Sequence, residues 1–227
     1  MSNVLPNGVN VKFDQNGNAL PFEGSTVIGY FNYEAFYQAL GQLTTAISAD
    51  KSLMSKLILL PASSYHVTVF DCVCQKAGGG WYWPSGVPRE TPIDECMEIL
   101  KARFSNIALN ELPDINLKIT GHKPFINTLA VTFSPNCGVD VDNLKCLRDS
   151  LSILSGIRRS NHETYEFHLT IGYFIDQVDF SDMSHLEKLL SDFFQRIEGL
   201  NDHVTLNKIS FCSFKDMLSY HPELCIK

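Results

Sequence analysis

Two segments of the chain, YHVTVF and FHLTIGYF, share a pattern that could carry acid–base chemistry. Both have the apolar character of strands. Successive strand side chains point to opposite faces, so His66 shares a face with Thr68, and His168 shares one with Thr170. An imidazole accepts or donates a proton near neutral pH, and a threonine hydroxyl donates a hydrogen bond to a phosphate oxygen. Two such pairs facing one cleft would supply a base, an acid and two hydroxyl donors, which is the minimum set for phosphodiester cleavage without a metal.

The His-x-Thr pattern occurs at four places, His66, His162, His168 and His203. We interpret His162 as a loop residue, because no strand pattern surrounds it. His203 begins the last expected strand, but it lacks the preceding aromatic residue and the fully apolar flanks. His66 and His168 are therefore the candidate catalytic pair. The alternative is that both are hydrogen-bonded core histidines.

Hydrophobic periodicity predicts alternating strands and helices along the chain. The Asn-Gly pair at 16–17 predicts a type I′ hairpin, since this turn needs positive φ at both positions. The Thr-Pro pair at 91–92 predicts a helix start with the threonine as N-cap, and Ser184 with Glu187 predicts a capping box. We expect strands at 26–31, 117–122, 126–133, 165–174 and 204–214, a strand–turn–strand unit at 57–71, a long loop at 72–90, and helices at 33–50, 92–104, 141–156 and 184–198.

Strand and helix alternate twice in a comparable order, and each half carries one strand of the aromatic-His-apolar-Thr type. No Pro/Gly/Ser-rich linker or charge run separates the halves. We therefore expect one α+β domain over residues 1–227, with two lobes, two antiparallel sheets facing a central cleft, and helices on the outer faces.

Charge and composition restrict the partners. The formal net charge is −7, whereas proteins that follow a long phosphate backbone usually have a basic face. A long duplex nucleic acid is therefore not expected, although a small phosphorylated ligand needs only a local cluster of donors. The N-terminus has no signal-peptide pattern and no apolar run spans a membrane, so we expect a cytoplasmic protein without membrane contact. The seven cysteines lack metal or redox spacing and are expected to be reduced thiols.

The glycine-rich stretch before residue 90 contains further candidates for substrate binding. Trp83 is a candidate for stacking on a base, the alternative being that it anchors the loop to the core. Lys76 and Arg89 flank the loop and are candidates for contacting a phosphate, the alternative being two solvated charges. The glycines lack P-loop spacing, and no zinc or EF-hand pattern occurs, so no metal site is expected.

The whole set of motifs resembles the 2H phosphoesterase superfamily, whose members carry two His-x-Thr or His-x-Ser motifs on facing lobes. In this chain the two histidines are 102 positions apart. The surroundings are similar to a little-characterised branch, a domain of unknown function. In that branch an opening like VKFDQNGNALPFEGSTVIGYF precedes HVTVFD, a YWP loop, TPIDEC and FHLTIGYF. The resemblance covers nearly the whole chain.

This resemblance implies a bilobal fold with pseudo-two-fold symmetry, no cofactor, and hydrolysis of cyclic phosphates or of 2′,5′- or 3′,5′-linked oligonucleotides; some relatives join RNA ends. It implies that His66 and His168 are the acid–base pair and that Thr68 and Thr170 donate to the phosphate. Tyr173 occupies the place where many relatives have an arginine or an aromatic residue, and it is the implied substrate-binding residue.

Strict alternation places Gly172 on the catalytic face, where the missing side chain would leave room for a ligand. Alternation points Tyr173 away from His168, so binding by this tyrosine needs a bend at Gly172; otherwise it packs in the core.

We expect the protein to be a metal-independent phosphodiesterase that acts on a small nucleotide or a short oligonucleotide. We also expect it to be a monomer. One alternative is a non-catalytic module that binds or senses nucleotides in the same cleft. The other is a structural domain whose histidines are simply buried.

Overall fold

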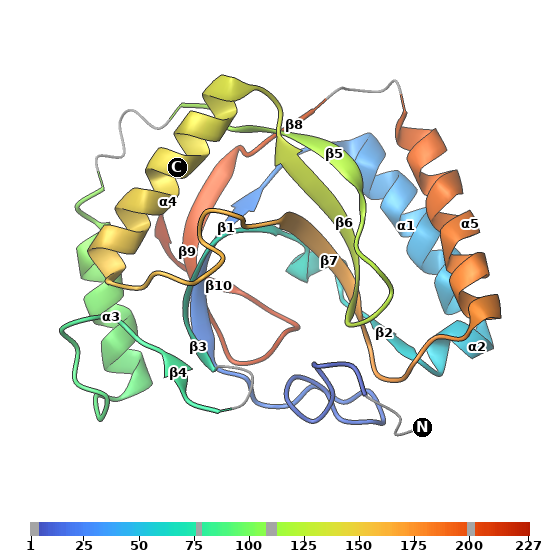
Figure 1. Ribbon diagram of the computed structural model, residues 1–227, viewed down its shortest axis with the longest axis horizontal. Helices are drawn as coiled ribbons and strands as arrows, with labels where there is room; N and C mark the ends of the chain where they lie inside the picture. Colours follow the sequence, from blue (N-terminus) through green and yellow to red (C-terminus); the bar gives the residue numbers. More distant parts are fainter. Residues whose placement is uncertain (1–4, 76–78, 108–112, 199–202) are drawn as a thin grey trace.

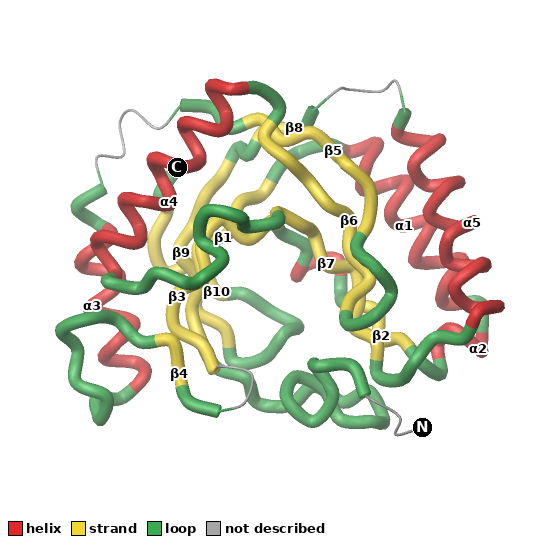
Figure 2. The backbone as a smooth tube through the Cα atoms, viewed as in Figure 1, coloured by secondary structure: helices red, strands yellow, loops and turns green. Residues whose placement is uncertain are grey.

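A strongly curled antiparallel sheet forms the centre of the molecule, and helices cover its outer side (Figure 1, Figure 2). The computed structural model describes residues 5–75, 79–107, 113–198 and 203–227. The strands within these ranges are β1 (Gly24–Tyr30), β2 (Leu57–Leu59), β3 (Val67–Gln75), β4 (Trp81–Tyr82), β5 (Asn116–His122), β6 (Thr128–Pro135), β7 (Phe167–Phe174), β8 (Val204–Thr205), β9 (Lys208–Phe214) and β10 (His221–Cys225). The helices are α1 (Glu34–Ser48), α2 (Lys51–Met54), α3 (Ile93–Phe104), α4 (Gly138–Ser155) and α5 (Phe180–Ile197), with a 3₁₀ turn at Ala62–Ser64.

The strand order divides the sheet into two halves. Its path runs β10-β9-β1-β3-β7-β6-β5-β8, with β2 paired to β7 and β4 paired to β3. The halves meet between β3 and β7 at one residue pair, Val67 with Leu169, which we call the seam. Both side chains of the seam are fully buried. The α+β fold with facing antiparallel sheets is thus confirmed, and the two sheets are continuous through the seam.

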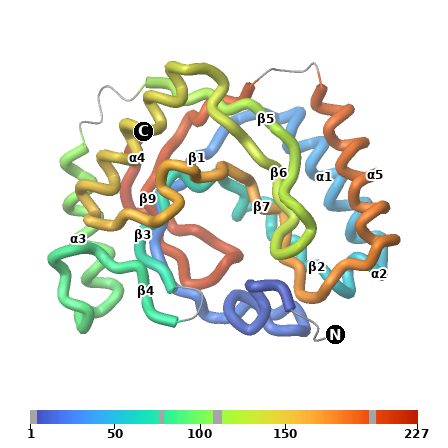
Figure 3. Tube along the Cα trace, in the orientation of Figure 1, coloured from blue at the N-terminus to red at the C-terminus, as the bar shows by residue number. Residues whose placement is uncertain are grey.

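Two pairs of helices pack on the outer side. Helices α1 and α5 lie side by side over the half that contains β5, β6 and β7, whereas α3 and α4 lie over the other half (Figure 1). Figure 3 shows that α1, near the blue end of the chain, packs beside the late helix α5. Phe36 of α1 joins this layer to the sheet, because its ring lies 5.6 Å from Phe193 of α5 and 6.4 Å from Phe133 of β6. Within the described residues, no helix has the length and apolar character needed to cross a membrane.

The N-terminal segment does not form the predicted hairpin. Within the Asn-Gly pair only Gly17 has positive φ, at 88°, so the turn is not type I′. The Asp14 carboxylate accepts hydrogen bonds from the backbone N–H groups of Asn16 and Asn18, at 2.9 and 2.8 Å. This local bonding closes a compact turn, and isolated bridges at Phe13 replace the paired strands.

Two helix starts differ from the predicted capping residues. Pro92 occupies the N-cap position of α3, and no side chain caps that end, so the predicted cap at Thr91 is wrong. Helix α5 begins four residues before the predicted Ser184, because Asp179 accepts from the backbone N–H of Asp182 at 2.9 Å. A carboxylate at this position satisfies a free N–H of the first turn.

The other differences concern where elements begin and end. Helix α4 begins at Gly138, three residues before the predicted start, where the Asp140 carboxylate accepts from the backbone N–H of Cys137. Strand β3 continues through Gln75 into the segment predicted as loop, because it pairs with β1 and β4. Strand β10 was not predicted. Its sequence, HPELC, has no apolar alternation, and pairing with β9 makes it a strand.

Candidate active site

The two His-x-Thr segments meet at the seam. Extending the seam register by one residue in each direction places His66 opposite Thr170 and Thr68 opposite His168. The seam side chains point into the core, so these four side chains point to the opposite face. All four line one cleft of about 670 Å³. The structure therefore brings together the four residues that the sequence analysis proposed as catalytic.

Each histidine ring is held in the same way. His66 Nδ1 lies 2.7 Å from the carbonyl oxygen of Ser64, and His168 Nδ1 lies 2.9 Å from that of Glu166. A carbonyl oxygen only accepts, so Nδ1 carries the proton in both rings and Nε2 of the neutral ring has a free lone pair. The His66 ring also packs edge-on against Tyr220, with 4.2 Å between centroids. Both imidazoles are thus held in the tautomer that presents an accepting nitrogen.

Burial makes both histidines harder to protonate. Desolvation lowers the pKa of His66 to about 4, and the neighbouring His168 adds to this effect, while the Ser64 carbonyl and Asp71 oppose it. Desolvation also lowers the pKa of His168, and the charge of Lys123 acts in the same direction. Both imidazoles are therefore mainly neutral at pH 7 in the unliganded protein.

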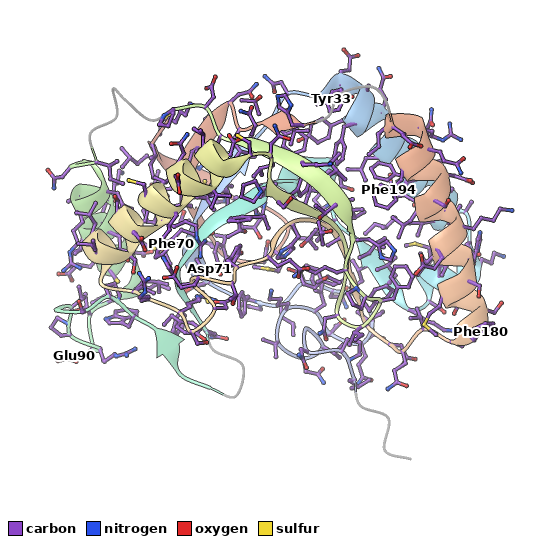
Figure 4. The ribbon with its side chains drawn as sticks, turned by 45° about the horizontal axis from the view of Figure 1, so that its top comes forward. Tyr33, Phe70, Asp71, Glu90, Phe180 and Phe194 are labelled. Carbon is purple, nitrogen blue, oxygen red and sulfur yellow. The ribbon has the colours of Figure 1, made fainter. Side chains whose placement is uncertain are left out.

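A β-bulge determines which residue follows the first motif on the cleft face. The register between β3 and β1 skips Val69. Alternation from Thr68 would place Phe70 on the cleft face, but after the bulge Asp71 lines the cleft and Phe70 is buried. Figure 4 labels both residues. Asp71 is not among the residues predicted from the sequence. The signal in the sequence is the break of alternation in VTVFD, where two apolar residues are adjacent.

A second bulge acts in the same way after the second motif. The register between β7 and β6 skips Ile171, and Tyr173 then lines the cleft. The Tyr173 hydroxyl accepts a hydrogen bond from Lys12 Nζ at 3.2 Å. The expectation that Gly172 leaves room for a ligand is wrong. A Cβ at Gly172 would lie 2.4 Å from the carbonyl oxygen of Ile58, so the glycine permits close approach of β2 instead.

The other predicted substrate-binding residues lie elsewhere. Trp83 donates from Nε1 to two carbonyl oxygens of its own loop, at 3.1 Å each. Arg89 donates to the carbonyl oxygen of Trp81 at 3.2 Å. Neither side chain lines the cleft, so the structure does not bring them to the histidines. Lys76 lies outside the described residues.

An ion pair lies in the cleft wall on the side of β3. Arg159 Nη1 is 3.4 Å from the Asp71 carboxylate, and Nη2 donates to the Cys74 sulfur at 2.9 Å. The guanidinium also lies 4.1 Å from the centroid of the Tyr82 ring. Lys12 and Arg159 are the two basic residues of the cleft lining and Asp71 is its carboxylate, among the residues that the structure describes. An acidic chain thus presents a small cationic cleft, and neither basic residue is among those predicted from the sequence.

A buried arginine connects the surroundings of the two motifs. Arg148 of α4 donates to the carbonyl oxygen of Val69 in the first bulge, and also to that of His162, at 2.9 Å. Its guanidinium lies 4.5 Å from the centroid of the Tyr165 ring. The Tyr165 hydroxyl in turn hydrogen-bonds to the Thr68 side chain. Helix α4 therefore positions the first motif through the loop that leads to the second.

The other two His-x-Thr histidines lie outside the cleft, and His162 is in a loop as predicted. The His162 ring is buried, and its Nε2 lies 2.9 Å from Asp149. Asp149, His162 and Glu163 could together present ligand atoms to a metal, but Arg158 hydrogen-bonds to both carboxylates. The Arg158 guanidinium already provides the positive charge that a metal would provide beside these two carboxylates. His203 is exposed just before β8.

The fold and the site define a class of α+β proteins in which two His-x-Thr strands meet at one cleft. The family model named 2H-phosphodiest, described as a domain of unknown function (DUF1868), matches residues 12–127. The match covers slightly more than half of the chain, and the chain belongs to this family. The matched range includes the first His-x-Thr motif, and the second lies beyond it. A comparison with curated proteins gives no significant match.

Solved structures extend the comparison to the whole fold. The crystal structure of ATU0111, a conserved protein of unknown function from Agrobacterium tumefaciens str. C58, has a TM-score of 0.86 at 24% identity and covers 99% of this chain and 94% of its own. This likeness shows the fold. Usb1 from Kluyveromyces marxianus has a TM-score of 0.42 at 12% identity, over 88% of this chain and 97% of its own, and its structure with uridine monophosphate has the same TM-score and identity.

Proposed function

We propose that the protein is a metal-independent phosphodiesterase that hydrolyses a 2′,3′-cyclic phosphate or a short 2′,5′- or 3′,5′-linked oligonucleotide. One observation carries the proposal. Two imidazoles, each held through Nδ1 and accompanied by a threonine hydroxyl, line the same cleft on either side of the seam. Membership of a 2H phosphodiesterase family supports the reaction class.

For a cyclic phosphate, the reaction needs one neutral and one protonated imidazole. The neutral ring accepts a proton at Nε2 from water as the water oxygen bonds to phosphorus. The bond from phosphorus to one ribose oxygen breaks, and the protonated ring gives its Nε2 proton to that oxygen. The hydroxyls of Thr68 and Thr170 donate to the non-bridging oxygens. The two rings finish with exchanged protonation, and proton exchange with solvent restores them.

In this scheme one imidazole takes the missing proton from solvent as the substrate binds. Both imidazoles are mainly neutral in the unliganded protein, whereas a bound phosphate anion favours the protonated form. Because kcat/KM reflects the free enzyme, its maximum should lie below about pH 6.5, the ordinary histidine pKa.

The test is hydrolysis of a panel of 2′,3′-cyclic nucleotides and of 2′,5′- and 3′,5′-linked oligoadenylates. We expect His66→Ala and His168→Ala each to lower kcat by about 10²–10⁴-fold, the usual contribution of general acid–base catalysis. His203→Ala is the matched control, because this exposed histidine belongs to a His-x-Thr pattern outside the cleft. The rate of hydrolysis by this variant should equal that of the wild type.

Activity that persists in both His66→Ala and His168→Ala would refute the assignment. EDTA should leave the rate unchanged, whereas inhibition that zinc reverses would favour a metallohydrolase.

The lowered pKa of both histidines favours a second candidate, a module that binds or senses nucleotides without turnover. Such a module needs no imidazolium. It predicts tight binding of a panel nucleotide with no product over hours, and the same panel therefore distinguishes the two functions.

A further inference from the structure

Lys12 is a basic residue of the cleft that the chemistry at the two histidines does not use. Its Nζ lies 3.2 Å from the Tyr173 hydroxyl, 4.9 Å from the centroid of the Tyr173 ring and 5.2 Å from that of Phe22. Among the described residues, no carboxylate oxygen lies within 4.0 Å of Lys12 Nζ, so this group forms no ion pair. The ammonium group is therefore surrounded by aromatic rings and a hydroxyl.

The contrast with Arg159 shows what is missing at Lys12. The Arg159 guanidinium has the Asp71 carboxylate as its counter-ion and the Cys74 sulfur as an acceptor. The aromatic faces and the hydroxyl at Lys12 attract an ammonium group, but an anion would be a stronger partner. Among the described residues of the cleft lining, Lys12 is thus the cation without a counter-ion.

Lys12 is also fixed in place, unlike an ordinary surface lysine. Its backbone N–H donates to the carbonyl oxygen of Gly8 at 2.8 Å, within the turn that precedes it. The ring of the next residue, buried Phe13, lies 5.2 Å from the Tyr173 ring. At the start of the segment, the Asn7 N–H donates to the Asn127 side chain at 2.8 Å. The segment that carries Lys12 is therefore packed against β7 and the residue before β6.

The position along β7 separates Lys12 from the reacting groups. Its partner Tyr173 follows Thr170 by three residues on the same strand, which is roughly 7–10 Å at the usual rise per residue. This spacing between backbone positions leaves room in the cleft for a second group beside the phosphate that the histidines and threonines hold. An anion at Lys12 can then be another group of the same ligand.

We propose that Lys12 and Tyr173 form a second anion subsite that binds a phosphate group of the substrate other than the one that reacts. This inference rests on the proposed function and narrows its substrate class. The substrate is a nucleotide with two phosphate groups, such as a cyclic phosphate that also carries a 5′-phosphate, or an oligonucleotide with a further phosphate.

The test compares adenosine 2′,3′-cyclic phosphate with and without a 5′-phosphate. The wild type should have a KM about tenfold lower for the 5′-phosphorylated substrate, a difference of about 1.4 kcal/mol. Lys12→Met should remove this difference, and Lys12→Arg should restore most of it because the charge returns. Lys145→Met is the matched control, since Lys145 is exposed on α4 and outside the cleft.

A second measurement does not depend on turnover. Calorimetry should show that adenosine 2′,5′-bisphosphate binds more tightly than adenosine 2′-monophosphate to the wild type, and that Lys12→Met abolishes the advantage. If no substrate of the panel is hydrolysed but this binding result holds, the proposed function fails and the subsite stands.

If hydrolysis occurs without a 5′-phosphate preference, or if the preference survives in Lys12→Met, the subsite is wrong and the proposed function stands. If there is neither hydrolysis nor a bisphosphate advantage, both are wrong.

Discussion

A backbone carbonyl two residues before each histidine determines what its imidazole can do. The carbonyls of Ser64 and Glu166 accept from Nδ1, so both rings offer Nε2 to a ligand. Burial beside the cleft lowers the pKa of both histidines. Protonation of either ring is therefore coupled to the binding of an anion. The surroundings of His66 and His168 therefore determine both the tautomer and the charge of the two rings.

The lowered pKa of His66 predicts a loss of stability in acid. The folded-state value is about 4 and the unfolded value is 6.5, so the unfolded chain binds more protons between these limits. Stability is full above about pH 6.5 and falls as the pH drops towards 4. Between pH 7 and pH 5 this group should cost about 2 kcal/mol of the free energy of unfolding. Urea unfolding at both pH values measures it.

The control for this prediction is a pair of glutamine variants. His66→Gln should lose less stability than the wild type between pH 7 and pH 5, whereas His203→Gln, at an exposed position, should follow the wild type. An identical pH dependence in His66→Gln and the wild type would show that His66 is not held neutral by burial.

At the scale of elements, two bulges and one close strand contact build the cleft. The bulges skip Val69 and Ile171, and each brings the next polar side chain of its strand, Asp71 or Tyr173, onto the cleft face. β2 approaches β7 so closely at Gly172 that only a residue without a side chain fits. The second bulge therefore lies between the catalytic motif and a tightly packed strand pair.

Gly172→Ala should disturb this packing. The added Cβ would lie 2.4 Å from the Ile58 carbonyl oxygen and 3.1 Å from a Leu57 methyl group. We expect a loss of about 1–3 kcal/mol in the free energy of unfolding, the usual cost of overpacking. Gly41→Ala is the control, because Gly41 lies in α1 with nothing within 4 Å of a Cβ, and it should gain about 0.5–1 kcal/mol. Denaturant unfolding of both variants measures these changes, and equal stabilities would contradict the close contact.

At the scale of the whole molecule, charge is distributed unevenly. The chain has a net charge of −7, yet its cleft is lined by Lys12 and Arg159 against a single carboxylate, Asp71, among the described residues. A cleft of about 670 Å³ suits a small ligand. The acidic remainder of the surface opposes a long phosphate backbone, which needs many cations along its length.

This charge distribution predicts discrimination by length. A duplex RNA of about 20 base pairs at about 0.15 M salt should not inhibit hydrolysis of a 2′,3′-cyclic nucleotide, because few phosphates can reach the two cations. A nucleoside 2′-monophosphate, which resembles the product, should compete. Competition assays with both compounds provide the measurement. Inhibition by the duplex at micromolar concentration, relieved by salt, would mean that a basic surface outside the cleft binds it.

Local pattern was enough to identify the strands of the two motifs and the shared face of each histidine and threonine, because strand side chains alternate regardless of what the strand pairs with. Strict alternation gave the wrong surroundings for Gly172, and it allowed Tyr173 to reach the cleft only with a bend near Gly172, since a bulge depends on the register with a neighbouring strand. It also missed Lys12 and Arg159, which come from an N-terminal turn and from a loop without any periodic signal. Trp83, selected for its residue type, bonds within its own loop, and Arg89 bonds to β4.

The amino-acid sequence by itself determined the α+β class, the resemblance to two-histidine phosphoesterases and the pairing of each imidazole with a hydroxyl. The class and the pairing follow from residue types and short-range spacing, and the resemblance rests on motifs along nearly the whole chain. Only the tertiary structure decided that the motifs meet at the seam, which residues follow them on the cleft face, and which cations reach the cleft. Those outcomes depend on contacts between segments far apart in the chain, and no local pattern encodes the register or the packing that creates them.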